Sequence, residues 1–205
     1  LFHIACHAVS MYPSTPAINA DWPGPASAAL SQALGGGESL FLQGCAGEIT
    51  PGYRGAKAVA DMAAVVASKS QVALKFAVKL KPEPIRVGRA YVELPLTPAA
   101  SQRTGTETVK AEVQAIVCGP LALVGLPGEP LTELGLAIRE ASPFPQTLVL
   151  GYSNGNGVHY VGMPHEKARG GYEVGVAGAG APKCGPMLVE AANKLLAELF
   201  AQRGK

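Results

Sequence analysis

The spacing of apolar residues changes several times along this chain, and each spacing predicts a type of element. Short apolar runs bounded by turn residues predict buried strands at 1–6, 39–43, 121–126 and 147–150. Runs with a period of two predict strands with one solvated face at 72–80, 85–96 and 109–117. Apolar side chains at helical spacing predict helices at 26–34, 56–68, 131–141 and 186–202. The polar stretch 97–108 and the Gly- and Asn-rich stretch 151–161 are predicted to be loops.

This order of elements predicts an α/β fold with mixed β-sheets covered by helices. Strands alternate with helices near the beginning, and antiparallel pairs occupy the middle of the chain. The 205 residues contain no internal repeat and no linker, so we expect residues 1–205 to form one structural unit. Leu1 already belongs to a strand-like run, with no polar segment before it. We therefore expect the chain to be the C-terminal part of a larger catalytic domain.

Composition excludes several classes of partner and site. The net charge is +2 and only 16% of the residues are charged, without a basic stripe, which argues against nucleic-acid binding. No apolar run has the length of a membrane span. The four cysteines lie far apart and form no Cys-x-x-Cys pair, which argues against a zinc ribbon. They are predicted to be free, mostly buried thiols, with a single long-range disulfide as the alternative.

Three polar residues at predicted strand ends are candidates for a site, and each has a purely structural alternative. Glu129 lies in a Pro-Gly turn between a strand and a helix, where it would either cap the helix or project into a cleft. His7 follows the first predicted strand and is either a hydrogen-bonded core imidazole or a metal ligand. Thr50 lies in a loop, bonded to its own backbone or to a ligand. In the same loop, Gly47 lets the backbone approach a ligand or another strand closely.

Five short segments of the chain resemble the neutral/alkaline ceramidase superfamily in order and in spacing. The resemblance extends from residue 1 to about residue 175, and the ordered set is more specific than any one segment. The segments are Ala-Cys-His-Ala-Val-Ser-Met at 5–11, Gln-Gly-Cys-Ala-Gly-Glu-Ile-Thr-Pro at 43–51, Pro-Gly-Glu at 127–129, Asn-Gly-Asn-Gly-Val-His-Tyr-Val at 154–161 and Gly-Tyr-Glu at 171–173.

The resemblance implies a zinc-dependent amidohydrolase of lipid and sphingolipid metabolism, which cleaves the N-acyl bond of ceramide or of a related N-acyl lipid. It assigns His7, Glu129 and Tyr160 as zinc ligands. Zinc bound by three protein ligands of N and O type keeps an open position for a water molecule, whose pKa it lowers to about 7. The family's remaining zinc-ligand histidine and its neighbouring general-base histidine come from an earlier His-x-His motif, which this chain does not contain. The remaining partner of the site would therefore be the N-terminal segment of the same domain, and this chain alone should be inactive.

The same resemblance assigns the residues that would act on the substrate. Tyr172 corresponds to a second tyrosine that faces the scissile carbonyl, and Thr50 stands where ceramidases carry an active-site serine. Gly47, Glu48 and Asn154 are predicted to line the substrate site.

Some residues depart from the ceramidase pattern and keep other functions open. Glu48 and Cys45 stand where ceramidases carry Asp and Asn, and Pro130 stands where they carry Phe. The alternatives are an inactive ceramidase-like protein that only binds a ligand, and an amidase for a non-lipid N-acyl substrate.

Overall fold

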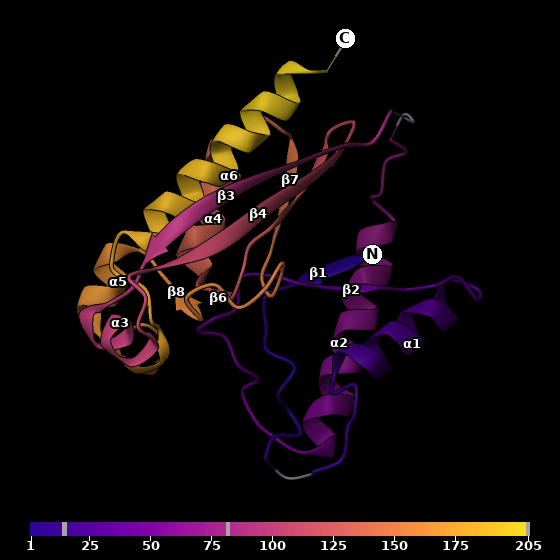
Figure 1. Cartoon of the computed structure of the whole chain (residues 1–205). Helices are drawn as coiled ribbons and strands as arrows, with labels where there is room; N and C mark the ends of the chain where they lie inside the picture. Colours follow the sequence, from indigo (N-terminus) through magenta and orange to yellow (C-terminus); the bar gives the residue numbers. More distant parts are fainter. Residues whose placement is uncertain (14–15, 81–82, 204–205) are drawn as a thin grey trace. The chain divides into compact units, whose positions relative to one another are not determined.

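The computed structural model describes residues 1–13, 16–80 and 83–203. The chain divides into two compact units. We call residues 1–43 with 49–79 the first unit, and residues 44–48 with 80–205 the second unit. In Figure 1 the first unit is mainly indigo to purple, and most of the second runs from magenta to yellow. Each has a core of its own. That both belong to one larger catalytic domain stays a prediction.

The first unit joins two short parallel strands to two helices. Strand β1 (Phe2–Ile4) pairs with β2 (Phe41–Gln43), and the helices are α1 (Pro23–Ala33) and α2 (Ala56–Leu74). A proline at the start of α1 suits the first helical turn, where no N–H bond is lost. Phe41 of β2 packs against the core of this unit, which consists of Phe2, Cys6, Trp22, Ala26, Leu30, Ala63 and Val66.

The prediction of a strand over 72–80 is wrong. Helix α2 continues to Leu74, and residues 75–80 carry no strand. A helix that already exists adds residues at little cost, and the Ala and Leu residues here favour it. The alternating pattern beyond it finds no buried face, since Phe76 and Val78 are 79% and 81% exposed.

The second unit is built on a four-stranded sheet in the order β3-β4-β5-β7. The strands are β3 (Arg86–Pro95), β4 (Thr108–Cys118), β5 (Leu121–Gly125) and β7 (Gln146–Leu150). The first two pairings are antiparallel and the third is parallel. A parallel pair needs a crossover connection, and α4 (Thr132–Ala141) lies in it.

One face of this sheet is covered by the last helix, α6 (Cys184–Ala201), which packs on β3 and β4 and beside α4 (Figure 1). The core lies between sheet and helices and includes Val113, Val117, Val124, Leu134, Ile138, Val149, Leu188 and Leu196. The predicted fold class, α/β with mixed sheets covered by helices, is therefore confirmed.

The prediction that the segment 97–108 is a loop is only partly right, because α3 (Pro98–Thr104) lies within it. The Thr97 hydroxyl accepts a bond from the Ala100 N–H, Pro98 occupies the first turn, and Gly105 ends the helix with φ 73°. These are ordinary start and stop signals for a helix. The prediction of a loop followed the polar composition of the segment and overlooked these signals.

The second unit also contains short elements that carry the candidate site. These are β6 (Glu129–Pro130), β8 (Tyr160–Val161), α5 (Pro164–Arg169) and a π-helical turn, η1 (Tyr172–Ala177). All four cysteines are free thiols. None of the helices formed by the described residues is long and apolar enough to cross a membrane.

Candidate active site

The pairing of β6 with β8 places the first two candidate residues side by side. Glu129 and Tyr160 are direct partners in this parallel pair. The approach requires glycine at position 128, which has φ 69°, because a Cβ there would lie 2.3 Å from the carbonyl oxygen of His159. The Pro-Gly turn therefore lets the loop before β8 pack directly against the turn that carries Glu129.

The Glu129 carboxylate is held at both oxygens. The Tyr152 hydroxyl donates a hydrogen bond to Oε2 at 3.0 Å, and Nε2 of His159 lies 3.1 Å from Oε1. The Glu129 side chain is only 13% exposed. The Glu129 carboxylate thus faces a cluster of polar side chains.

The two phenols beside Glu129 keep their protons at neutral pH. Burial, together with a hydrogen bond to Glu129 and its negative charge, raises the pKa of Tyr160 to about 12. Burial and the same carboxylate also raise the pKa of Tyr152. Both hydroxyls are therefore neutral hydrogen-bond donors toward one carboxylate.

His159 connects this cluster to η1. Its Nδ1 lies 3.3 Å from the carbonyl oxygen of Ala177, and its ring lies 4.6 Å from the ring of Tyr160 between centroids. Because the two ring nitrogens face different oxygens, the imidazole bridges the end of η1 and Glu129. The prediction from the sequence did not include His159 or Tyr152, although both lie in the Gly- and Asn-rich loop that it singled out.

Tyr172 lies next to Tyr160 at the start of η1. The two ring centroids are 6.1 Å apart in an edge-to-face arrangement, and Tyr172 is 62% exposed. The predicted ligand tyrosine and the predicted carbonyl-facing tyrosine are thus neighbours, and the second is open to a molecule from outside.

Gly47 approaches the backbone of β6 closely. Its N–H donates a hydrogen bond to the Pro130 carbonyl at 3.0 Å, and a Cβ at this position would lie 2.7 Å from the Glu129 carbonyl oxygen. Of the two alternatives for Gly47, the structure provides close approach to another strand. Its role at a substrate stays a prediction.

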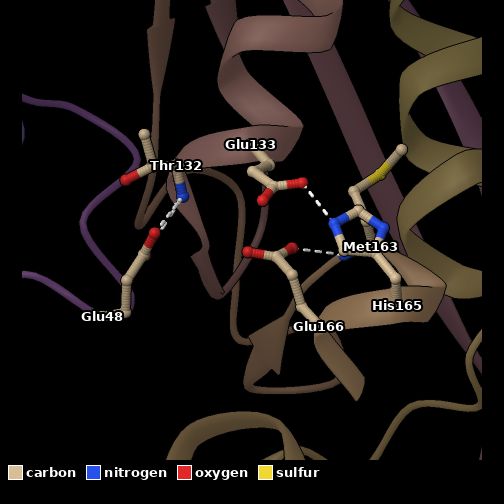
Figure 2. Close-up of polar contacts among 6 residues, drawn as sticks. All are labelled: Glu48, Thr132, Glu133, Met163, His165 and Glu166. Carbon is tan, nitrogen blue, oxygen red and sulfur yellow. Dashed lines mark hydrogen bonds and ion pairs between the residues drawn. The ribbon is translucent and has the colours of Figure 1, made fainter. Parts of the chain in front are cut away.

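Glu48 caps helix α4, as Figure 2 shows. The Thr132 N–H donates to both carboxylate oxygens, at 2.8 and 3.0 Å. It is one of the N–H groups that have no partner within the helix, and a carboxylate there is also favoured by the helix dipole. The capping role considered for Glu129 thus belongs to Glu48, whose contact with a substrate remains untested.

A second group of charged residues in Figure 2 connects α4 to α5. Glu133 lies 2.5 Å from Nε2 of His165, and the Glu166 carboxylate accepts a bond from the Met163 N–H at 2.6 Å. Burial, followed by the charges of Glu133 and Glu48, raises the pKa of Glu166. These contacts hold the short helix in the segment between β8 and η1.

Asn154 lies at the tip of the loop after β7, with φ 59°. With Ser153 it lines a small hollow on the sheet beside Ile116, Leu123 and Leu150. Its side chain lies over Gly125, where a Cβ would be 3.7 Å from Nδ2. The predicted substrate contact is therefore a polar group at the edge of an apolar surface.

His7 and Thr50 belong to the first unit. His7 is buried, with 7% exposure, and its N–H donates to the Ile49 carbonyl at 2.9 Å. This bond places His7 beside the segment that ends in the exposed Thr50. The His7 carbonyl accepts a bond from Nε1 of the buried Trp22 at 3.0 Å, so packing of the Trp22 indole fixes the backbone that carries the imidazole.

The loop after His7 is organised by Asp21. Its two oxygens accept bonds from the N–H groups of Ser10 and Met11, at 3.0 and 2.8 Å. Burial alone would raise the pKa of Asp21, but the backbone N–H groups of Met11, Trp22 and Ser10 outweigh it and hold the pKa below its ordinary value. Asp21 is therefore a charged anchor for the His7 loop.

Two solved structures share the fold of this chain. A neutral ceramidase from Pseudomonas aeruginosa superposes with a TM-score of 0.76 at 16% identity, covering 98% of this chain and 44% of the ceramidase chain. A ceramidase complexed with C2 superposes with a TM-score of 0.79 at 15% identity, covering 98% of this chain and 45% of the other. The chain has the fold of part of a neutral ceramidase.

The ceramidase resemblance predicted from the sequence is thereby confirmed for the fold. No protein-family profile and no curated protein sequence matches the chain. The chain spans less than half the length of either ceramidase. Likeness at this level of identity describes the fold, and catalysis is a separate question.

Within the ceramidase fold, the donors predicted for zinc belong to both units. Glu129 and Tyr160 lie together in the second unit, and His7 belongs to the first. Among residues 1–13, 16–80 and 83–203, no group of three or more His, Cys, Asp and Glu side chains could hold a metal ion. The paired carboxylate and phenol, with the imidazole of His159 beside them, are nevertheless oxygen and nitrogen donors of the kind that zinc accepts.

Proposed function

We propose that the protein is a zinc-dependent hydrolase of N-acyl bonds, of the ceramidase type. The observation that supports this most is the direct register of Glu129 with Tyr160, since it brings together a partly buried carboxylate and a phenol from distant segments. The ceramidase fold over 98% of the chain supports the same reaction class. The proposed substrate is ceramide or a related N-acyl lipid.

Glu129, Tyr160 and His7 would hold the zinc ion, and their donor atoms suit it in kind. When bound, zinc would supply a water molecule of lowered pKa and would polarise the amide carbonyl. Glu129 and Tyr160 are positioned by the same pair of strands, and the His7 backbone is held by Ile49 and Trp22. The chain thus fixes each proposed ligand by backbone bonds.

The remaining residues would act on the amide directly. Tyr172 would donate its phenolic proton in a hydrogen bond to the carbonyl oxygen, where negative charge develops. Thr50 would orient the attacking water through its hydroxyl, as a serine would, with an added methyl group in the pocket. The exposure of both residues leaves them accessible to a substrate.

A second candidate is a ceramidase-fold protein that binds a ligand without cleaving it. The observation that favours it is the state of Glu129, whose two oxygens already face Tyr152 and His159. A carboxylate satisfied in this way needs no metal ion. The two candidates differ in metal content, which makes zinc the first quantity to measure.

The experiment is the substitution Glu129→Gln in the full-length protein. The neutral amide loses the charge that binds the cation, so we expect more than about 100-fold loss of zinc affinity and of N-acyl hydrolysis. Zinc is measured by elemental analysis, and hydrolysis on a panel of ceramides and non-lipid N-acyl compounds. Glu140→Gln, exposed near the end of α4, is the matched control.

Each outcome of this experiment points to one candidate. Loss of zinc and activity in Glu129→Gln alone supports the hydrolase. Unchanged zinc and activity in that variant contradicts it. A wild-type protein that binds a lipid, binds no zinc and cleaves no compound of the panel supports the binder. Cleavage restricted to non-lipid compounds identifies a different amidase.

A further inference from the structure

Tyr152 is the side chain that holds the Glu129 carboxylate from the side of the four-stranded sheet. Its hydroxyl donates to Oε2 at 3.0 Å, while His159 faces the other oxygen. Tyr152 follows β7 and Tyr160 lies in β8, so the hydroxyl comes from neither of the strands that present the proposed ligands. Its contact with Glu129 is therefore an additional restraint on the carboxylate.

The backbone around Tyr152 is arranged to make this contact. The Tyr152 N–H donates a hydrogen bond to the Gly128 carbonyl at 2.8 Å. The Gly128 N–H donates in turn to the Gly155 carbonyl at 2.9 Å. The Glu129 N–H donates to the His159 carbonyl at 2.8 Å. The loop 151–159 thus encloses the turn that carries Glu129 on both sides.

This loop also holds side chains in an unfavourable backbone conformation. Tyr152, Asn154 and His159 have φ values of 53°, 59° and 67°, in the left-handed region that residues with a Cβ rarely adopt. Glycine adopts this conformation without steric cost. Tyr152 adopts it in the loop that brings the phenol against Glu129.

A carboxylate that binds a metal ion usually needs a second contact. A hydrogen-bond donor on the carboxylate fixes its rotamer and so the direction in which it meets the ion. Tyr152 meets this need, because its hydroxyl donates to Oε2 of Glu129 from a loop that is itself bonded to the turn carrying Glu129.

We propose that Tyr152 is a positioning residue, whose hydrogen bond to Oε2 fixes the orientation in which the Glu129 carboxylate would meet the metal ion. This inference rests on the proposed function, since it gives Glu129 the role of a ligand. Tyr152 itself touches neither metal nor substrate in this proposal. His159 holds the second oxygen, but it precedes Tyr160 directly, so its substitution would disturb a proposed ligand.

The test is Tyr152→Phe in the full-length protein, which removes one hydroxyl and keeps the ring. We expect zinc affinity to fall about 10- to 100-fold, the usual effect of losing such an outer contact. Affinity is measured by competition with a chromophoric chelator, and the cobalt-substituted protein gives an absorption spectrum that reports ligand geometry. Tyr91→Phe, on the exposed part of β3, is the control and should match the wild type in both.

Two comparisons separate this inference from the proposed function. A shifted cobalt spectrum and weaker zinc binding in Tyr152→Phe, with an unchanged unfolding midpoint, support the positioning role. Wild-type zinc affinity and spectrum in Tyr152→Phe overturn it, while loss of zinc in Glu129→Gln would still support the hydrolase. If zinc binding is insensitive to Glu129→Gln as well, both proposals fail together.

Discussion

At some positions of this chain, two segments approach each other so closely that only glycine fits between them. Gly47 shows this, because the Glu129 carbonyl oxygen and a methyl carbon of Leu131 would both lie 2.7 Å from a Cβ at position 47. One of these neighbours is backbone, which cannot move aside as a flexible side chain does. The glycine therefore sets the separation between the loop 44–48 and the turn that carries Glu129.

We expect Gly47→Ala to destabilise the protein by about 1–3 kcal/mol, because the added methyl group overpacks a backbone contact. Chemical unfolding measures this change. Gly52→Ala is the control, since a Cβ there meets no atom within 4 Å and should leave the unfolding midpoint near that of the wild type. Equal midpoints for the two variants would contradict the close approach.

Helices and strands of the second unit depend on contacts from distant segments. Helix α4 begins after Leu131, whose side chain offers no capping bond, and the cap comes instead from Glu48. Sequence patterns predict the helix from its apolar spacing, but a cap supplied from 84 positions away in the sequence lies outside any local pattern. The same loop also contacts β6 through Gly47.

Removing this cap should cost stability without changing the helix itself. We expect Glu48→Ala to lower the free energy of unfolding by about 0.5–2 kcal/mol, the range for a lost N-terminal cap. Glu140→Ala at the other end of α4 should be neutral or slightly stabilising, because a negative charge is unfavourable at a helix C-terminus. Urea unfolding of both variants checks the prediction, which fails if Glu140→Ala is the more damaging.

For the chain as a whole, the presence of two cores means that stability has two contributions. The first unit relies on Asp21, a buried carboxylate whose lowered pKa comes from backbone N–H bonds to the His7 loop. A carboxyl whose pKa is lowered by folding adds stability above its unfolded pKa, near 4. That stability is lost as the pH falls through the lower pKa of the folded state.

Asp21→Asn should therefore destabilise the first unit by about 1–3 kcal/mol at neutral pH, because an amide presents an N–H group to a backbone donor. The difference from wild type should shrink below about pH 4, where the wild-type carboxyl begins to take up its proton. Hydrogen exchange of first-unit amides across this pH range measures both. Asp61→Asn is the control, since Asp61 is bonded on the surface to Lys57 and Tyr53. A pH-independent difference would contradict the role of the charge.

Local pattern was sufficient for most of the fold. Periodicity and turn residues predict β3, β4, β5, β7, α4 and α6 within a few residues. The apolar residues of β3, β4, α4 and α6 have a regular spacing, and β5 and β7 are short apolar runs between turn residues. It failed at 72–80, where an alternating pattern has no partner, and at α3, where capping residues carry the signal. The Pro-Gly turn indicated Glu129, the ceramidase resemblance added Tyr160, and the structure makes these two neighbours.

Only the tertiary structure decided which groups surround Glu129. Tyr152 and His159 reach it through a loop with left-handed residues, and Glu48 takes the capping role at α4. Spacing along the sequence constrains neither the rotation of a loop nor the register of two-residue strands such as β6 and β8. Those depend on close backbone contacts at Gly47 and Gly128, which arise when distant segments pack together.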